Sequence, residues 1–167
     1  MKKLKYKIID NFLNQNDFNK LKDMVFADGF PYYYIKTLND NQKDVSDKSP
    51  FYFVHTVFEK YQITSDCFFN LKPILDKISA KALIRMKINF YPKTPKIVKH
   101  AFHTDLDFPH KGCILYFNDC NGYTLLEDGT KIETKENRVL LFNSGRPHAS
   151  TSCTDKKARV NLNINYL

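Results

Sequence analysis

The sequence contains no run of about 18 or more apolar residues, so a transmembrane helix is not expected. Its N-terminus, MKKLKYKIID, is charged and lacks the apolar stretch of a secretory signal. We therefore expect a cytoplasmic protein without a membrane partner. The four cysteines, Cys67, Cys113, Cys120 and Cys153, show no C-x-x-C spacing. In a reducing compartment we expect free thiols and no zinc site built from them.

Tryptophan is also absent, but 14 Phe and 10 Tyr supply aromatic side chains for a packed, β-rich core. No internal repeat or low-complexity segment is apparent, and 167 residues predict a single domain spanning 1–167. The net charge of +8 comes from lysines that are interleaved with acidic residues, without a dense basic block. This pattern is typical of a solvated surface and does not favour nucleic acid as a partner.

The pattern of apolar residues divides the chain into N-terminal support, 1–81, and a strand-rich core, 82–167. In the support we predict strands over 4–9 and 51–60, a β-prone segment over 31–36, helices over 11–27 and 65–79, and a polar loop over 38–50. In the core we predict eight short strands, over 82–91, 97–103, 111–118, 122–127, 130–134, 138–143, 148–153 and 158–166. This order fits a mainly β fold, a double-stranded β-helix (jelly roll), with two helices packed outside one sheet.

Three short segments of the core carry candidate chemistry: His103-Thr104-Asp105, then His148, then Arg159. Residues two apart on a strand point to the same face, so His103 and Asp105 could reach one metal ion. His148 must then come from another strand. Two imidazoles and one carboxylate hold one face of Fe(II) and leave the opposite face open for O2 and a co-substrate.

From His103 onward the chain resembles the 2-oxoglutarate- and Fe(II)-dependent oxygenases, most closely their prolyl 4-hydroxylase-like branch. The matching segments are HTD, GCILYFND, GYTLLEDGT, RVLLFNSGRPH and RVNLNINYL, and the opening YKIIDNFLNQNDFNKLKDMV resembles the strand-then-helix entry of that branch. The resemblance implies that His103, Asp105 and His148 bind iron and that Arg159 binds the distal carboxylate of 2-oxoglutarate. It also implies a hydroxylation that consumes O2 and 2-oxoglutarate and releases succinate and CO2.

Four further residues are candidates for contact with 2-oxoglutarate. Tyr116 matches a family tyrosine whose hydroxyl supports the distal carboxylate, and Tyr91 lies near the position of another tyrosine close to the cofactor. Thr124 is a weaker candidate, since it could equally be an ordinary strand threonine. Asn161 lies one strand period from Arg159 and could donate to a dianion there.

Other polar residues near these segments are expected to lie outside the site. The far end of the last strand, near Asn165, should face solvent or form a structural hydrogen bond. His110 could lie near the entrance of the site, but we favour a position at the surface, and we expect Asp107 at a strand end or in a loop. Arg146 could contact substrate or form a surface ion pair, and the sequence does not separate these two roles.

The substrate that we favour is a peptide or protein side chain such as proline. Nucleic-acid oxygenases of the AlkB-like branch generally carry two arginines in the terminal strand region, whereas only Arg159 follows His148 here. A small-molecule substrate remains open. The competing class is a cupin-like metal-binding or sensing protein without catalysis, which would need neither Arg159 nor Tyr116.

Overall fold

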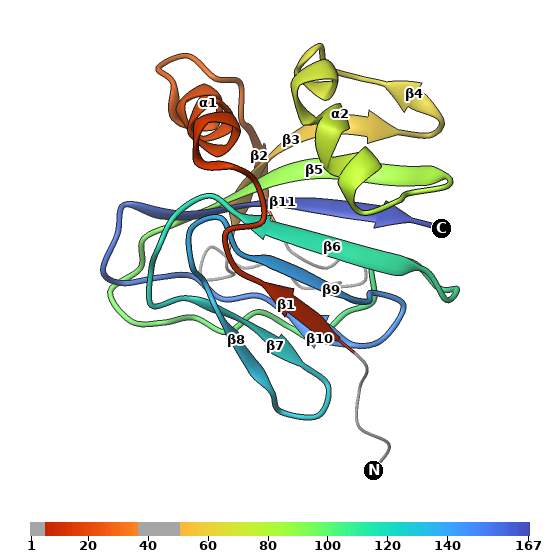
Figure 1. Ribbon diagram of the computed structural model, residues 1–167. Helices are drawn as coiled ribbons and strands as arrows, with labels where there is room; N and C mark the ends of the chain where they lie inside the picture. The colour runs from red at the N-terminus through yellow and green to blue at the C-terminus, as the bar shows by residue number, and fades with distance from the viewer. Residues whose placement is uncertain (1–5, 37–50) are drawn as a thin grey trace.

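The strands dominate the fold, which is described by a computed structural model for residues 6–36 and 51–167 (Figure 1). The helices are α1 (Gln15–Phe26) and α2 (Cys67–Lys77). The strands are β1 (Lys7–Ile9), β2 (Tyr33–Ile35), β3 (Tyr52–Glu59), β4 (Gln62–Ile63), β5 (Leu83–Pro92), β6 (Lys111–Tyr116), β7 (Tyr123–Leu126), β8 (Lys131–Glu133), β9 (Val139–Asn143), β10 (His148–Ala149) and β11 (Ala158–Tyr166). The polar loop expected over 38–50 lies outside the described residues.

The strands form two antiparallel sheets. The large sheet has the order β1-β9-β6-β11-β5-β3-β2, with β4 paired to β3, and the small sheet has the order β10-β7-β8. Figure 1 shows α1 and α2 on one side of the large sheet and the small sheet on the opposite side. The chain is thus mainly β with two helices, as the sequence predicts.

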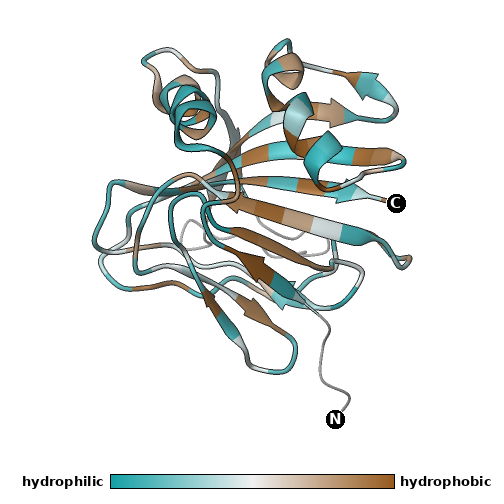
Figure 2. Cartoon of the chain, viewed as in Figure 1, coloured by the Kyte–Doolittle hydropathy of each residue, from teal (hydrophilic) through white to brown (hydrophobic). Residues whose placement is uncertain are grey.

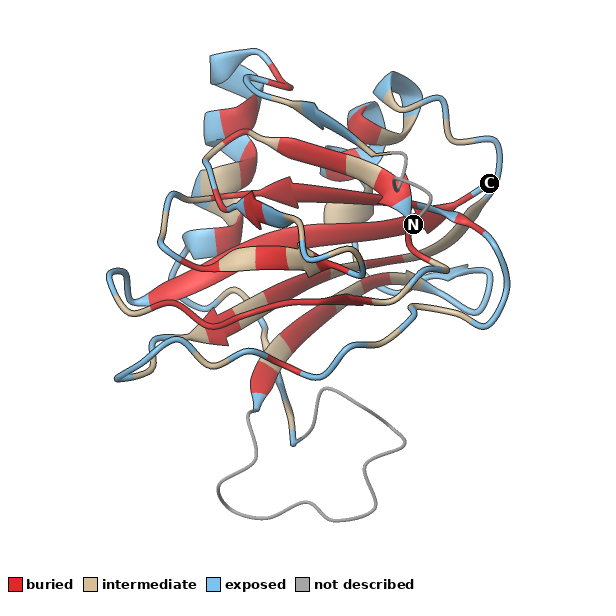
Figure 3. Ribbon diagram, turned by 90° about the horizontal axis from the view of Figure 1, so that it is seen from below, coloured by how far each residue is buried: buried red, intermediate tan, exposed pale blue. Residues whose placement is uncertain are grey.

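The central strand β11 shows why the sheet separates an apolar layer from a polar one. Along β11 and its neighbour β5, hydrophilic and hydrophobic residues alternate (Figure 2). Val160, Leu162 and Ile164 belong to an apolar core that also contains buried residues of α1 and α2. The alternate residues of β11 are polar but equally buried, and the large sheet is mostly in the buried class (Figure 3). The opposite face of β11 is therefore a polar interior.

Helix α1 begins later than predicted because of its N-terminal cap. Asn11 has a φ of 50°, in the left-handed region, so a right-handed helix cannot start there. Asn14 is the cap, and its side chain accepts a hydrogen bond of 3.0 Å from the backbone N–H of Asp17. Phe18, Leu21 and Val25 then form the buried side of the helix.

The predicted strand over 97–103 is wrong as a regular strand. The segment pairs with 148–153 only through isolated bridges, at Lys99 with Thr151 and at His103 with His148. One cause is that the backbone N–H of Val98 donates to the side chain of Ser152 (2.9 Å) and not to a backbone carbonyl. The predicted strand over 148–153 is correspondingly reduced to the two residues of β10. The short strand β4 was not predicted.

Neither helix in the described part of the chain has the length and apolar character needed to cross a membrane.

Candidate metal and co-substrate site

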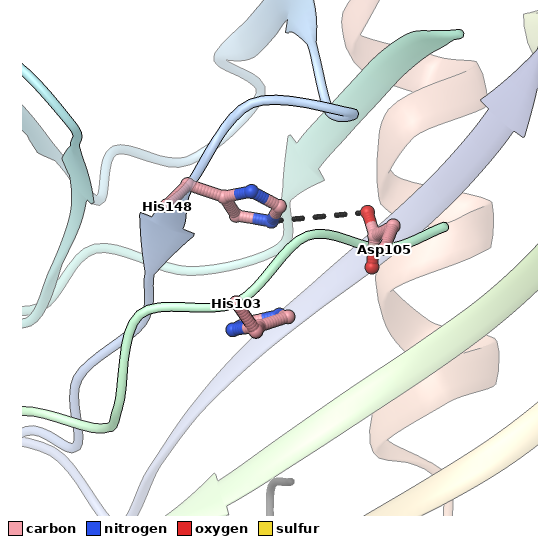
Figure 4. Close-up of side chains that lie close together, drawn as sticks. All are labelled: His103, Asp105 and His148. Atoms are coloured by element: carbon pink, nitrogen blue, oxygen red, sulfur yellow. Dashed lines mark ion pairs between the residues drawn. The ribbon is translucent and has the colours of Figure 1, made fainter. Parts of the chain in front are cut away.

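Three side chains with metal-binding atoms converge between the sheets: His103, Asp105 and His148 (Figure 4). One ligand atom from each lies within 4.8 Å of the other two. Nε2 of His148 is 3.8 Å from Oδ2 of Asp105, and the two imidazole centroids are 4.6 Å apart. The structure thus brings together the three residues that the sequence singled out as ligands, and we call them the triad.

Backbone hydrogen bonds hold the triad in place, although His103 and Asp105 do not share a regular strand. His103 and His148 exchange both backbone N–H···O=C bonds, each 2.9 Å long. Two residues on, the backbone N–H of Asp105 donates to the carbonyl of Ser144 over 3.1 Å. A β-bridge at His103 followed by a bend therefore brings the side chains of His103 and Asp105 together, which a regular strand was expected to do.

Both imidazoles are oriented for metal binding through Nε2. Nδ1 of His148 is 3.0 Å from the carbonyl oxygen of Arg146, and Nδ1 of His103 is 3.3 Å from that of Ala101. A carbonyl only accepts, so each Nδ1 carries a proton, and Nε2 is the ring nitrogen that remains for a cation. Burial and the neighbouring His148 lower the pKa of His103 to about 4, so its ring is neutral at neutral pH.

Asp105 is held by three donors. Its side chain is 1% exposed. Oδ1 accepts from Nη2 of Arg85 at 2.8 Å, and Oδ2 accepts from the side-chain amides of Asn163 at 3.2 Å and Asn165 at 2.9 Å. A carboxylate has about four lone-pair sites, so roughly one remains, which suits a single bond to a metal.

The charge state of Asp105 also suits a metal ligand. Burial alone would raise the pKa of its carboxyl group, but electrostatic interactions with His148, Lys87 and Arg85 outweigh burial. The pKa therefore lies below its ordinary value, and Asp105 is ionised at neutral pH.

We expect Asn165→Ala to weaken Fe(II) binding by about 10- to 100-fold, because residues that orient a metal ligand typically contribute that much. Asn161→Ala is the matched control: it removes an amide from the same face of the same strand, and its side-chain partner is Asn89, not Asp105. Iron titration of both variants under anaerobic conditions measures the effect. Equal iron affinity in the two variants would show that Asn165 does not position Asp105.

His110 is not at the surface, contrary to expectation. It is 5% exposed, and its Nε2 is 2.7 Å from Oγ of Ser144, which in turn accepts from the amide of Asn165 at 3.0 Å. Nδ1 of His110 is 2.8 Å from the carbonyl of Phe108. His110 is therefore drawn into the structure by a network that ends on the donors to Asp105. The expected structural hydrogen bond of Asn165 is present.

The other two uncertain residues lie outside the triad. Asp107 is exposed. Arg146 forms an ion pair of 2.7 Å with Glu127, and both side chains are partly exposed. The surface ion pair considered for Arg146 is thus present.

Arg159 is completely buried at the other end of the polar face of β11. Nε donates to Oγ1 of Thr134 at 2.7 Å, and Nη2 donates to Oγ1 of Thr124 at 2.9 Å. Nη1 has only a long contact, 3.4 Å, to the carbonyl of Thr151. No carboxylate within 6–36 or 51–167 forms an ion pair with this guanidinium. A buried charge without a counter-charge is costly, so the site is suited to an external anion.

Two tyrosines flank the Arg159 guanidinium. Its central carbon is 5.5 Å from the ring centre of Tyr91 and 5.4 Å from that of Tyr116. The hydroxyl of Tyr116 donates to Thr124 Oγ1 at 2.9 Å. Burial raises the pKa of both phenols, so they remain neutral hydroxyl groups. The structure thus gathers Tyr91, Tyr116 and Thr124 around Arg159.

The polar face of β11 and β5 between Arg159 and the triad, which we call the strip, contains unpaired hydrogen-bond acceptors. Asn161, expected to donate to an anion, accepts from the amide of Asn89 at 3.1 Å. The side-chain oxygens of Asn89 and Asn163 are buried and have no partner among the described residues. Such atoms require a donor from water or from a bound molecule. The strip is therefore a buried polar surface that has hydrogen-bond acceptors left for a donor.

We expect the pH dependence of stability to change in His100→Gln. Burial and the charge of Arg159 lower the pKa of His100 to about 3 from its ordinary value of 6.5. Below pH 6.5 the unfolded chain therefore binds a proton that the folded chain refuses. The free energy of unfolding therefore decreases as the pH is lowered from 6.5 toward 3, by up to about 1.4 kcal/mol per pH unit for this group. Urea unfolding at pH 7 and pH 5 measures it; an unchanged pH dependence in the variant would contradict this assignment.

The roles of Arg85, Asn163, Thr134 and Asn165 were not predicted from the sequence. A signal for Arg85 was present. In the segment LIRMKINFY, Arg85, Lys87, Asn89 and Tyr91 share one face, and they pair across the sheet with Asn165, Asn163, Asn161 and Arg159. Two adjacent strands with matching polar faces indicate a polar interior. Thr134 carried no such signal.

Comparison with known proteins gives a result for the structure but not for the sequence. No family model and no curated protein matches the sequence. Solved structures match along nearly the whole chain. A prolyl hydroxylase from Trichoplax adhaerens, in complex with a peptide of the hypoxia-inducible factor oxygen degradation domain, has a TM-score of 0.69 at 17% identity, covering 97% of this chain and 83% of that one.

Two further structures show how widely this fold is used. A viral collagen prolyl hydroxylase from Paramecium Bursaria Chlorella virus-1, in its 2-oxoglutarate complex, has a TM-score of 0.61 at 14% identity and covers 96% of this chain and 94% of that one. The α-ketoglutarate-dependent epimerase SnoN from nogalamycin biosynthesis has a TM-score of 0.67 at 9% identity, covering 98% and 76%. The resemblance to 2-oxoglutarate- and Fe(II)-dependent oxygenases, prolyl hydroxylases among them, is thus confirmed in the fold.

Proposed function

We propose that this chain is a 2-oxoglutarate- and Fe(II)-dependent dioxygenase that hydroxylates a C–H bond on a peptide or protein side chain such as proline. The observation that carries the proposal is the pairing of two sites on one polar strip. The triad lies beside Asn163 and Asn165 of β11, and the buried Arg159 lies at the start of the same strand. A metal and a dianionic co-substrate would thus be bound next to each other.

The donor set fits Fe(II). His103 and His148 present their Nε2 atoms, and Asp105 presents one oxygen of an ionised carboxylate. Bound there, the iron would supply the activation of O2 at the expense of 2-oxoglutarate. Arg85 and Asn165 fix the carboxylate of Asp105 from behind, so that its orientation does not depend on the metal. Three protein ligands leave the remaining positions of the metal open.

The Arg159 pocket fits the distal carboxylate of 2-oxoglutarate. A guanidinium offers a permanent charge and a planar set of donors that matches a carboxylate. Thr124 receives hydrogen bonds from Arg159 and Tyr116, and it thereby orients both groups. Because Arg159 is fully buried, a bound carboxylate would be shielded from water, which strengthens the ion pair.

The same proposal includes the architecture. We propose that the two facing antiparallel sheets are the halves of a double-stranded β-helix, with α1 and α2 supporting the outside of the large sheet. The chain would act as one domain over 1–167 and work in the cytoplasm, without a membrane partner. The site then lies between the sheets, as the polar face of β11 requires.

A row of side chains leads from this site to an exposed edge of the large sheet. Asn161 pairs with Asn89, Asn89 with Val54, and Val54 with Tyr33, across the strands β11, β5, β3 and β2. Tyr33 is 64% exposed. An extended peptide could lie along this row, with Tyr33 as an aromatic contact for a prolyl ring. The peptide in the Trichoplax adhaerens complex supports this choice of substrate class.

A small-molecule substrate is the second candidate. It is favoured by the fold match to the epimerase SnoN from nogalamycin biosynthesis. Nucleic acid is disfavoured by the dispersed basic residues and by the single arginine after His148. A metal sensor without catalysis would leave the buried Arg159 without a purpose.

The test incubates the enzyme with Fe(II), 2-oxoglutarate and O2, together with proline-containing peptides, methylated single-stranded DNA or pools of small molecules. Mass spectrometry follows the gain of one oxygen or the loss of a methyl group, and succinate release follows turnover. We expect an oxidised peptide. Demethylated DNA without oxidised peptide would overturn the substrate proposal, and product formation only from small molecules would replace it with the second candidate.

A further inference from the structure

A second group of metal-binding side chains lies outside the active site. Cys120, Cys153 and Asp155 offer ligand atoms that all lie within 4.8 Å of one another. Cys120 lies between β6 and β7, whereas Cys153 and Asp155 lie in the segment that leads into β11. The group is at the Arg159 end of β11, away from Asn163 and Asn165, and it shares no residue with the triad.

Hydrogen bonds build this group from two loops that are distant in the sequence. The backbone N–H of Asn121 donates to both carboxylate oxygens of Asp155, at 3.0 and 3.1 Å. The side chain of Asn121 donates to Oγ1 of Thr154 at 2.7 Å and accepts from its backbone N–H at 3.0 Å. Each loop thus holds a cysteine one position before these contacts, and Asp155 is already oriented.

The surroundings of the two thiols favour a bound cation over a redox pair. Reactive thiols have a lowered pKa, which usually comes from a nearby positive charge or a helix N-terminus. Here burial raises the pKa of Cys120, and it raises that of Cys153 to about 11. The carboxylate of Asp155 acts in the same direction, whereas the charge of Arg159 lowers the pKa of Cys120. A divalent cation would place a further positive charge beside both sulfurs.

The donor atoms indicate which cation. Two thiolate sulfurs favour zinc or copper(I) over magnesium or calcium, and a carboxylate oxygen is a common zinc ligand. In a tetrahedral zinc site, donor atoms lie about 3.5 to 3.8 Å apart. Atoms already within 4.8 Å need only small side-chain movements to reach this spacing. Cys120 and Asp155 also line a cavity of about 660 Å³, which gives a water molecule access to the fourth position.

We propose that Cys120, Cys153 and Asp155 bind Zn²⁺, with water as the fourth ligand. Binding replaces the two thiol protons with two zinc–sulfur bonds and releases both protons to solvent. The ion would tie the loop after β6 to the loop before β11. Gly122 lies in the first loop, so close to Arg159 that a Cβ atom there would be 2.7 Å from Cδ of Arg159. Zinc would thereby brace the backbone that packs against this arginine.

Cobalt(II) is the probe for the test, because thiolate ligation gives an intense sulfur-to-cobalt absorption that the triad cannot produce. We expect this band in the full-length protein, its loss on addition of Zn²⁺, and its absence in the double variant Cys120→Ser with Cys153→Ser. Cys67→Ser is the matched control and should keep the band, because Cys67 lies in α2. Asp155→Asn keeps both thiols and should weaken cobalt binding by about tenfold or more.

Three outcomes would overturn the proposal. One is the absence of the band at excess cobalt(II), and another is a band of full strength in the double variant. The third is a protein that shows no band and in which oxidised glutathione forms a Cys120–Cys153 disulfide. The pair would then be a redox couple and not a metal site. If the double variant does not fold, the cobalt affinity of Asp155→Asn decides. Turnover with iron and 2-oxoglutarate is measured separately, so the proposed function stands or falls by itself.

Discussion

His148→Ala is expected to lose Fe(II) binding and turnover while it keeps the fold. The imidazole is one of three ligands, and its Nε2 lies 3.8 Å from Oδ2 of Asp105. The backbone bonds between His148 and His103, each 2.9 Å, do not involve the side chain and should survive. Iron titration and circular dichroism of the variant measure the two properties.

The control for this variant is another buried histidine. His55 is 6% exposed. Its Nδ1 lies 2.7 Å from the carbonyl oxygen of Pro31 and its Nε2 lies 2.8 Å from Oγ of Ser65, so its role is structural. His55→Gln should bind iron at full strength. His103→Ala should behave as His148→Ala does. Iron binding at full strength in both His103→Ala and His148→Ala would rule out the triad as the metal site.

Arg159→Ala is expected to raise the 2-oxoglutarate requirement strongly and to leave iron binding nearly intact. Removing one member of a buried charge pair typically costs about 3–5 kcal/mol, which corresponds to roughly 150- to 4,000-fold in affinity. Arg159→Lys should be intermediate, because the charge remains but the planar set of donors is lost. Co-substrate titration of succinate release gives these values.

The contrast between the two arginine variants is also the control. If Arg159→Ala acted only by disturbing the packing around Tyr91 and Tyr116, restoring the positive charge in Arg159→Lys would not lower the 2-oxoglutarate requirement. If Arg159→Ala has the same 2-oxoglutarate requirement as the wild type, another cation binds the distal carboxylate.

The sequence was sufficient for the features that follow from periodicity and residue type. Alternation along 158–166 predicted a polar face with Arg159 and Asn161 on it, and the structure has that face buried between the sheets. The residues His103, Asp105 and His148 were predicted as one group and the structure brings them together, although a bridge and a bend, and not a regular strand, place His103 and Asp105. These relations hold because local backbone geometry and a few pairing bonds determine them.

The features that the sequence did not reveal depend on contacts between distant segments. Arg85 reaches Asp105 because β5 lies next to β11, and strand order cannot be read from alternation. His110 is buried because its Nε2 forms hydrogen bonds with Ser144 and Asn165. The residues next to His110 in the sequence do not indicate these contacts. One reason that the segment 97–103 is not a regular strand is that Val98 donates to a side chain. Each of these outcomes is decided by a tertiary hydrogen bond.

The proximity of Cys120 and Cys153 belongs to the same class. Spacing motifs detect only ligands that lie close together in the sequence, and they predict no zinc site here. The hydrogen bonds of Asn121 with Thr154 and Asp155 help to join the two loops. A ligand set assembled in this way is visible in a structure and not in a pattern.

The most direct measurement of the central claim is an anaerobic titration of the protein with Fe(II) followed by 2-oxoglutarate. If one site holds both, the co-substrate chelates the iron, and a weak visible metal-to-ligand absorption appears. The account predicts this band in the wild type, its loss in His148→Ala, and its appearance in Arg159→Ala only at much higher 2-oxoglutarate concentration. Absence of the band in the wild type, with iron shown to be bound, would contradict the account and favour a metal-binding protein without oxygenase activity.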